Sequence, residues 1–318
     1  AYKPGELRGL DRSAREILLA AQHAPDGRLL IPERRLGYDL LVLAIGSRAN
    51  DFGTPGVAEH CYGIDSRRQA DHFNREVRIR LLQCLSQDGA LAIAIVGGGA
   101  TGVELAAELV QLVEASVGYG VPELASRISI TLLEAGPRLL AAFPEDISAA
   151  TRTRLETLGV KVMTGAQVSA ATADGFVLKD GSEVPATLKV WAAGVKGPDV
   201  FADLDGLEAT RNNQLVVGPT LRTSRDAAIY ALGDCASLTL AGAERPLPPT
   251  AQVAHQQAKY LSKSLPKVLR GEMVPDFRYR DMGALVSLGD YDAFGSLGQF
   301  GFFNGVTFRG RMAQLGHV

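Results

Sequence analysis

Three closely spaced glycines interrupt an apolar run in the chain. Residues 93–110 read IAIVGGGATGVELAAELV, in which Gly97, Gly99 and Gly102 have the GxGxxG spacing. In a strand–turn–helix unit the first glycine permits a tight turn, the second lets the backbone approach a pyrophosphate, and the third lets the helix pack against the strand. The helix N-terminus adds N–H donors and a positive dipole. The segment therefore predicts a phosphate site for a dinucleotide.

An acidic residue ends the next predicted strand. Residues 128–136 read ISITLLEAG and contain Glu134, where a dinucleotide fold places a carboxylate that accepts hydrogen bonds from the adenosine ribose hydroxyls. Because an acid repels a 2′-phosphate, Glu134 favours NADH over NADPH. It lies farther beyond Gly102 than the usual spacing of about 20 residues. We interpret residues 119–127, YGVPELASR, as an insertion loop that explains the surplus.

The composition indicates a globular protein of two or more domains. The chain has 318 residues, 46% of them hydrophobic, and a formal net charge of −2, which gives no indication of nucleic-acid binding. Its three cysteines are far apart, form no CxxC or metal-ligand pattern and suit a reducing compartment. The longest uncharged tract, 293–308, is too short and glycine-rich for a membrane span, and no secretory signal begins the chain. We therefore expect neither a metal centre nor a membrane-spanning helix.

Short strands precede the glycine turn and lead into a helix. Residues 15–22, 28–36 and 38–47 have the turn residues and apolar patterning of a small meander that feeds a buried strand. That strand is followed by Gly46, where the backbone could approach a ligand. Residues 66–89 have helical spacing and mixed charges, and we interpret their arginines as a solvated face.

A later strand repeats the pattern at Gly46. LKVWAAGV, residues 188–195, resembles LLVLAIGS, residues 40–47, because each is an apolar strand followed by small residues and a glycine, in the later case Gly194. We interpret both as crossings between two dinucleotide domains, where a strand end meets a cofactor. Two buried strands that happen to end in glycine are the alternative. Trp191, the only tryptophan, is assigned to the core.

A glycine and an aspartate follow a third apolar strand, AAIYALGDCA, at residues 227–236. Gly233 would let the chain approach a ligand closely, and the carboxylate of Asp234 could hold a hydroxyl of a sugar-like chain. A surface turn could have the same sequence.

The order of these motifs resembles that of a flavoprotein family. The two AxG strand ends, the central GGGATGVE and the ALGD resemble the two-dinucleotide flavoproteins of the pyridine nucleotide-disulfide reductase superfamily. PLPPTAQVAHQQAKYL at 246–261 and RYRDMGALVSLGDYDAFGSLG at 278–298 resemble type II NADH dehydrogenases, the single-subunit NADH:quinone oxidoreductases of respiratory membranes. The resemblance implies an α/β fold with two Rossmann-like dinucleotide-binding domains, the NAD domain inserted in the FAD domain, plus a small C-terminal sheet region. The expected parts are an FAD-binding domain in 1–89 and 197–275, an NAD-binding domain in 90–196 and a C-terminal region in 276–318.

This resemblance implies the cofactors FAD and NADH and a quinone substrate. A hydride would pass from NADH to the flavin and two electrons from the flavin to a membrane quinone, without proton pumping. Asp234 would bind the ribityl chain of FAD. A helix that Thr250 caps and that begins at Ala251 would direct its positive dipole at the pyrimidine edge of the flavin, where negative charge develops on reduction.

Three side chains are candidates for the catalytic chemistry. By the resemblance, Gln252 and His255 lie near the quinone, to whose carbonyl they can donate, and His255 can supply protons as the quinol forms. Glu104 would lie close to the flavin and the nicotinamide. The alternative for the first two is a polar helix face, to which we assign Gln257, whereas Gln256 is left open. The alternative for Glu104 is a favourable interaction with the helix dipole alone.

Both ends of the chain depart from the resemblance. No GxGxxG that would bind the FAD diphosphate precedes residue 90, and the sequence stops at RGRMAQLGHV, residues 309–318, where the family continues into amphipathic helices on the membrane surface. We therefore expect a fragment of a peripheral protein on the cytoplasmic face of the inner (cell) membrane. The phenylalanine-rich stretch at 294–308 would lie under those helices or pack within the sheet. A homodimer through the C-terminal region is compatible with the resemblance.

Two other functions agree with parts of the sequence. The first is a flavoprotein reductase of a disulfide or ferredoxin partner, although TAQVAHQ stands where such enzymes should carry a catalytic HP dyad. The second is a non-catalytic NADH-binding module, for which the missing FAD motif is the only argument.

Overall fold

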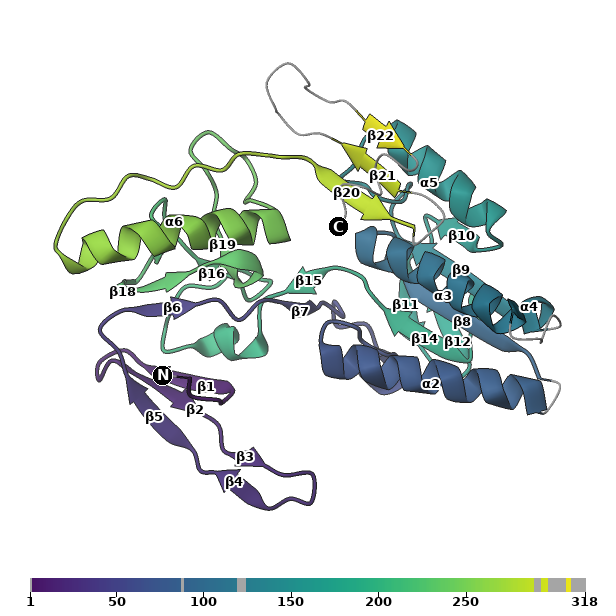
Figure 1. Cartoon of the computed structure of the whole chain (residues 1–318), viewed down its shortest axis with the longest axis horizontal. Coiled ribbons are helices and arrows are strands. Elements are labelled where there is room, and N and C mark those ends of the chain that lie inside the picture. Colours follow the sequence, from purple (N-terminus) through teal and green to yellow (C-terminus); the bar gives the residue numbers. More distant parts are fainter. Residues whose placement is uncertain (1, 87–88, 119–123, 289–292, 297–306, 310–318) are drawn as a thin grey trace. The chain divides into compact units, whose positions relative to one another are not determined.

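The computed structural model describes residues 2–86, 89–118, 124–288, 293–296 and 307–309 (Figure 1). The chain divides into two compact units. The first unit contains residues 1–48 and 195–279, and the second contains residues 49–194 and 280–318. The second unit is therefore inserted in the first, as the expected order of domains requires.

The first unit begins with a small antiparallel sheet. Its order is β1-β2-β5, and β3 and β4 form a separate hairpin whose turn has Gly27 at a φ of 83°. The predicted meander is confirmed, but β1 is an additional strand and the predicted strand at 15–22 is two short ones. The strands are β1 (Leu7–Asp11), β2 (Glu16–Leu19), β3 (Gln22–His23), β4 (Leu29–Ile31) and β5 (Arg34–Gly37).

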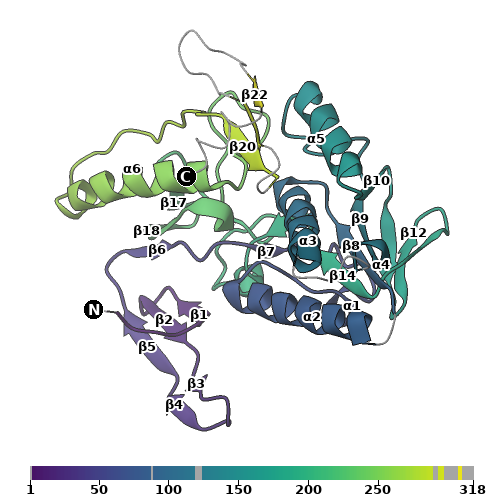
Figure 2. The same cartoon turned by 45° about the vertical axis from the view of Figure 1, so that its right-hand side comes forward.

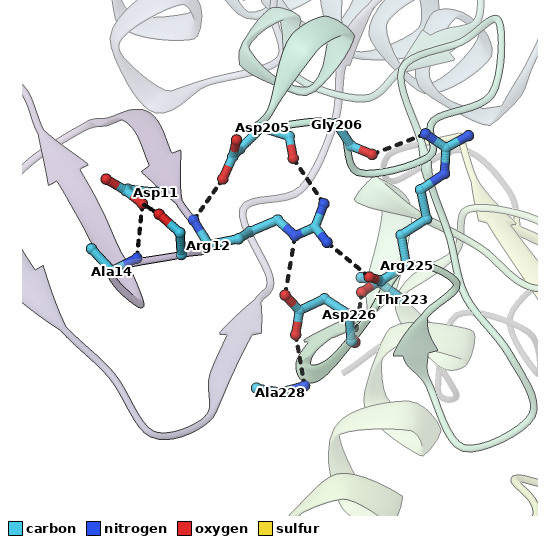
Figure 3. A network of polar contacts seen from close by, with 10 residues as sticks. Asp11, Arg12, Ala14, Asp205, Gly206, Thr223, Arg225, Asp226 and Ala228 are labelled. Carbon is cyan, nitrogen blue, oxygen red and sulfur yellow. Dashed lines mark hydrogen bonds and ion pairs between the residues drawn. The ribbon is translucent and has the colours of Figure 1, made fainter.

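Arg12 joins this small sheet to the rest of the first unit (Figure 3). Its guanidinium donates to Asp226 Oδ2 at 3.1 Å and to the carbonyl oxygens of Asp205 and Arg225 at 3.0 and 2.9 Å. The backbone N–H of Arg12 donates to Asp205 Oδ2 at 2.6 Å. One arginine therefore holds together segments that are about two hundred residues apart in the sequence.

The remainder of the first unit combines short strands with one long helix. β6 pairs in parallel with β18, which pairs with β17, and β16 pairs with β19. The predicted buried strand before Gly46 is only partly buried, because β6 is at an edge of its sheet and Val42 is 36% exposed, whereas Leu43 is buried. The elements are β6 (Leu41–Leu43), η1 (Asp199–Asp203), β16 (Leu215–Val216), β17 (Arg222–Thr223), β18 (Asp226–Ala231), η2 (Gly233–Cys235), β19 (Ala236–Ser237) and α6 (Ala251–Leu269).

The second unit is built on a parallel sheet of order β10-β9-β8-β14. Alternate residues of β8 face opposite sides: Ile93 and Ile95 pack with the helices, whereas Ala94 and Val96 pack with the antiparallel sheet β11-β12-β13. Figure 2 shows helix α3 beside β8 in this unit. Such two-sided burial explains why β8 reads as a continuous apolar run. The elements are α1 (Val57–His60), α2 (Arg67–Ser86), β8 (Leu91–Val96), α3 (Ala100–Gly118), α4 (Leu124–Arg127), β9 (Ile128–Glu134), α5 (Glu145–Thr157), β10 (Lys161–Thr164), β11 (Val168–Ala171), β12 (Gly175–Leu178), β13 (Glu183–Pro185), β14 (Leu188–Trp191), β20 (Ala284–Ser287), β21 (Ala293–Ser296) and β22 (Thr307–Arg309). The short strands β7 (Arg48–Ala49) and β15 (Val195–Lys196) lie where the chain crosses between the units.

The structure places the boundaries of the units differently from the sequence. The first boundary lies at residue 49, not at residue 90, because Phe73 and Val77 of α2 belong to the same core as Leu91 of β8. The C-terminal region also divides: residues up to 279 belong to the first unit, and the sheet β20-β21-β22 belongs to the second.

Part of the predicted insertion loop is helical. Its last four residues, Leu124–Arg127, form α4, and the side chain of Leu124 is buried in the core. Residues 119–123 lie outside the described part of the chain, as does most of the phenylalanine-rich stretch.

Candidate functional site

The glycine turn connects β8 to α3 with little space around two of its glycines. Gly97 has a φ of 118°, and a Cβ there would lie 2.6 Å from the carbonyl oxygen of Ala192. A Cβ at Gly102 would overlap the carbonyl oxygen of Gly97. In contrast, no described atom lies within 4 Å of a Cβ built at Gly99. The turn therefore agrees with the three predicted roles: a tight turn, an open approach for a ligand and close helix packing.

A pocket of about 420 Å³ lies beside this turn, entirely within the second unit. It brings together Gly97, Gly99, Glu134 and Gly194, four residues that the sequence predicted for cofactor binding. The other residues that line it are Phe52, Thr54, Val96, Ala135, Ala166, Gln167, Val168, Trp191, Ala192 and Ala193. The predicted Gly46 belongs to the first unit and does not line this pocket.

Backbone N–H groups hold the carboxylate of Glu134 at the pocket wall. Oε2 accepts a hydrogen bond from the N–H of Gly98 at 2.6 Å, and Oε1 accepts one from the N–H of Gly136 at 2.6 Å. A Cβ at Gly98 would lie 2.8 Å from the Cβ of Glu134 and 2.7 Å from Leu139 Cδ2. Gly98 is thus a fourth required glycine, and the sequence analysis missed it because it occupies a variable position of the GxGxxG pattern.

An aromatic side chain of the pocket was also missed. Phe52 is 66% exposed and has a φ of 53°, and its N–H donates to Asn50 Oδ1 at 3.0 Å. Trp191, which is confirmed as a core residue with 4% exposure, donates from Nε1 to the carbonyl oxygen of Asn50 at 2.8 Å. Nothing in the local sequence distinguishes an exposed phenylalanine of this kind from a buried one.

The Gly233–Asp234 turn lies in the first unit, after β18. Gly233 has a φ of 71°, which favours glycine, and begins η2. Ser47 Oγ donates to Asp234 Oδ2 at 2.9 Å, and Gln214 Nε2 donates to the carbonyl oxygen of Asp234 at 2.9 Å. Among the described residues, none donates to Oδ1, so this oxygen is available to a hydroxyl group of a ligand.

Helix α6 begins close to this turn. Thr250 is its N-cap and accepts from the N–H of Val253 at 3.3 Å, as predicted. Ala251 and His255 are exposed, and Gln252 is half-buried. Gln257 is only 2% exposed, and its Oε1 accepts from the N–H of Gly233 at 2.7 Å. Its assignment to a polar helix face is therefore wrong, because it lies on the buried face with Val253 and Leu261.

Glu104 lies on α3, in the second unit, and contacts the C-terminal sheet. Its Oε1 accepts a hydrogen bond from the N–H of Ser287 in β20 at 3.2 Å. Glu104 therefore does more than interact with the helix dipole: it links α3 to a strand from the end of the chain. Sequence spacing could not reveal this contact because the partner is a backbone group far along the chain.

Two cysteines are held in the thiol form by burial. Burial raises the pKa of Cys61 to about 12 and also raises the pKa of Cys235. All three cysteines are free. In the described ranges, no three His, Cys, Asp or Glu side chains gather as they would around a metal ion. The helices with described residues include none that is long and apolar enough to cross a membrane.

Comparisons with known proteins agree with this arrangement. The profile of the pyridine nucleotide-disulphide oxidoreductase family matches residues 10–258. The type II NADH:quinone oxidoreductase of Haemophilus influenzae is 40% identical over all of this chain and 76% of its own length, and that of Staphylococcus saprophyticus is 33% identical over 81% of this chain. The chain spans 65% of the length of the staphylococcal relative.

A solved structure shares the fold. The structure of NDH2 from Plasmodium falciparum in complex with NADH has a TM-score of 0.82 and 20% sequence identity, and the match covers 98% of this chain and 78% of that one. The chain therefore belongs to the pyridine nucleotide-disulphide oxidoreductase family and, within it, to the type II NADH:quinone oxidoreductases.

Proposed function

We propose that the protein is an FAD-dependent NADH:quinone oxidoreductase that passes electrons from NADH through a flavin to a membrane quinone. The observation that carries the proposal is the pocket of the second unit, in which Glu134 and the glycine turn come together in a chain 40% identical to a type II NADH:quinone oxidoreductase. In this pocket Gly97 and Gly99 would adjoin the pyrophosphate of NADH. Gly194, which lines the same pocket, would also contact the bound NADH. Glu134 would accept from the ribose hydroxyls and reject a 2′-phosphate.

The residues of the first unit fit FAD. Asp234 Oδ1 can accept from a ribityl hydroxyl, because Ser47 occupies only Oδ2. The N-terminus of α6 at Ala251 offers a positive dipole to the pyrimidine edge, and Gly46 leaves open space after β6. When bound, FAD supplies a carrier that accepts hydride from NADH and returns electrons to a quinone.

The family resemblance and the chemistry of three side chains support catalytic roles for them. Gln252 and His255 can donate hydrogen bonds to a quinone carbonyl, and the exposed imidazole of His255 can exchange protons with water and deliver them to the quinol. Glu104 would adjoin the nicotinamide and the flavin, held in place by the N–H of Ser287.

We also propose a peripheral location on the cytoplasmic face of the inner (cell) membrane, with contact through the C-terminal region, and a homodimer. Flotation of the full-length protein with anionic lipid vesicles tests the membrane contact, and light scattering in detergent tests the dimer. Protein that stays at the bottom of the gradient would contradict the first, and a monomeric mass the second.

The function is tested on the full-length gene product. We expect a yellow protein whose flavin absorbance NADH bleaches and a soluble quinone restores. A colourless protein, or a flavin that NADH cannot reduce, contradicts the proposal. Recovery of the absorbance with a disulfide or a ferredoxin, but not with a quinone, would favour the alternative reductase.

A further inference from the structure

Side chains from three separate segments of the first unit hold the turn Gly233–Asp234. Ser47, after β6, bonds to the Asp234 carboxylate, Gln214 bonds to the Asp234 carbonyl oxygen, and Gln257 of α6 bonds to the N–H of Gly233. Of these three side chains only Gln257 is buried, with 2% exposure, and the other two are half-buried. Two of the three hydrogen bonds are made to Asp234 itself. In the third, the buried Gln257 accepts from the N–H of the preceding residue, Gly233.

The position of Gln257 in α6 would ordinarily suit an apolar residue. It lies on the buried face of the helix with Val253, Leu261 and Ser264. A buried amide costs free energy unless it is hydrogen-bonded. Its partner is a backbone N–H at the start of η2, which has no carbonyl acceptor within that short helix. The turn and the helix also approach closely here, since a Cβ at Gly233 would lie 3.3 Å from the Cβ of Ala254.

We propose that Gln257 is a positioning residue of the flavin site, which fixes the Asp234 carboxylate relative to the N-terminus of α6. This inference rests on the proposed function, in which Asp234 takes the ribityl chain and α6 faces the pyrimidine edge of the same FAD molecule. The two groups belong to different elements, so both can bind one ligand well only if their separation is constant. Gln257 ties them together, because it lies in the second turn of α6 and bonds to the residue adjacent to Asp234.

The test compares Gln257→Met with Leu261→Ala in the full-length protein. Methionine has a similar length and an apolar surface, so it keeps the packing but leaves the Gly233 N–H without an acceptor. Leu261 is buried on the same helix face, and truncating it removes packing but none of the three hydrogen bonds that hold the turn. The measurements are the Kd of FAD for the apoprotein by fluorescence titration, the flavin midpoint potential, and the Tm of each apoprotein.

We expect Gln257→Met to weaken FAD binding about tenfold and to make the midpoint potential more negative, because the helix dipole no longer faces the reduced flavin correctly. Leu261→Ala should lower the Tm at least as much but change the Kd of FAD less than about twofold. An unchanged Kd in Gln257→Met, or an equal loss in Leu261→Ala, would overturn the positioning role alone. A wild-type protein that binds no FAD would overturn the proposed function and this inference with it.

Discussion

The two units hold their acidic residues in different ways. In the second unit, two backbone N–H groups hold the Glu134 carboxylate. In the first unit, the side chain of Ser47 holds the Asp234 carboxylate, and Gln214 and Gln257 hold the turn around it. A site built from main chain tolerates changes of neighbouring side chains but not of its glycines, whereas a site held by side chains depends on each of them.

The largest effect should follow Gly102→Ala, because the added methyl group overlaps the backbone of Gly97, which cannot move without disturbing the turn. We expect a loss of about 3 kcal/mol in the free energy of unfolding, measured by urea denaturation. Gly99→Ala is the matched control, since its methyl group meets no described atom. It should leave stability within about 0.5 kcal/mol of wild type and weaken NADH binding. Equal stability losses in both variants would contradict the main-chain account.

Side-chain contacts also stabilise the fold of the first unit. Arg12→Ala, which removes several of these contacts, should therefore lower the free energy of unfolding. The variant loses the half-buried pair with Asp226 and the side-chain bonds to the carbonyl oxygens of Asp205 and Arg225, and it keeps the backbone bond to the Asp205 carboxylate. We expect a loss of about 2 kcal/mol by urea denaturation. Arg8→Ala removes only an exposed pair with Glu33, so it should cost less than about 0.5 kcal/mol. Similar costs for the two arginines would show that the network in Figure 3 adds nothing to stability.

Cofactor choice should respond to the Glu134 charge. Glu134→Gln keeps one acceptor oxygen, so it loses one of the two backbone hydrogen bonds, and it no longer repels a 2′-phosphate. We expect NADH binding to weaken about tenfold and the preference for NADH over NADPH to shrink, measured as the ratio of the two Kd values. An unchanged ratio would mean that Glu134 does not face the ribose.

Ser47→Ala should give the smallest effect. It removes one hydroxyl donor from Asp234 and leaves the turn in place. We expect FAD binding to weaken about fivefold, with NADH binding unchanged. A loss of NADH affinity in this variant would contradict the assignment of different dinucleotides to the two units.

The same contrast explains how far the sequence could predict the molecule. The glycine turn, the strand before it and Glu134 were predictable because a main-chain site requires glycines and small residues at defined spacing. Gln257 was assigned to the wrong helix face, since the local helix pattern allows a polar residue on either face. Gly98 and Ser47 matter through partners distant in the chain.

The most direct test measures both dinucleotides on two variants of the full-length protein. We expect Asp234→Ala to lose FAD but to keep NADH binding, and Glu134→Ala to keep FAD but to lose NADH binding, by titration of each variant. Loss of NADH affinity in a folded Asp234→Ala protein that still retains FAD would contradict the account.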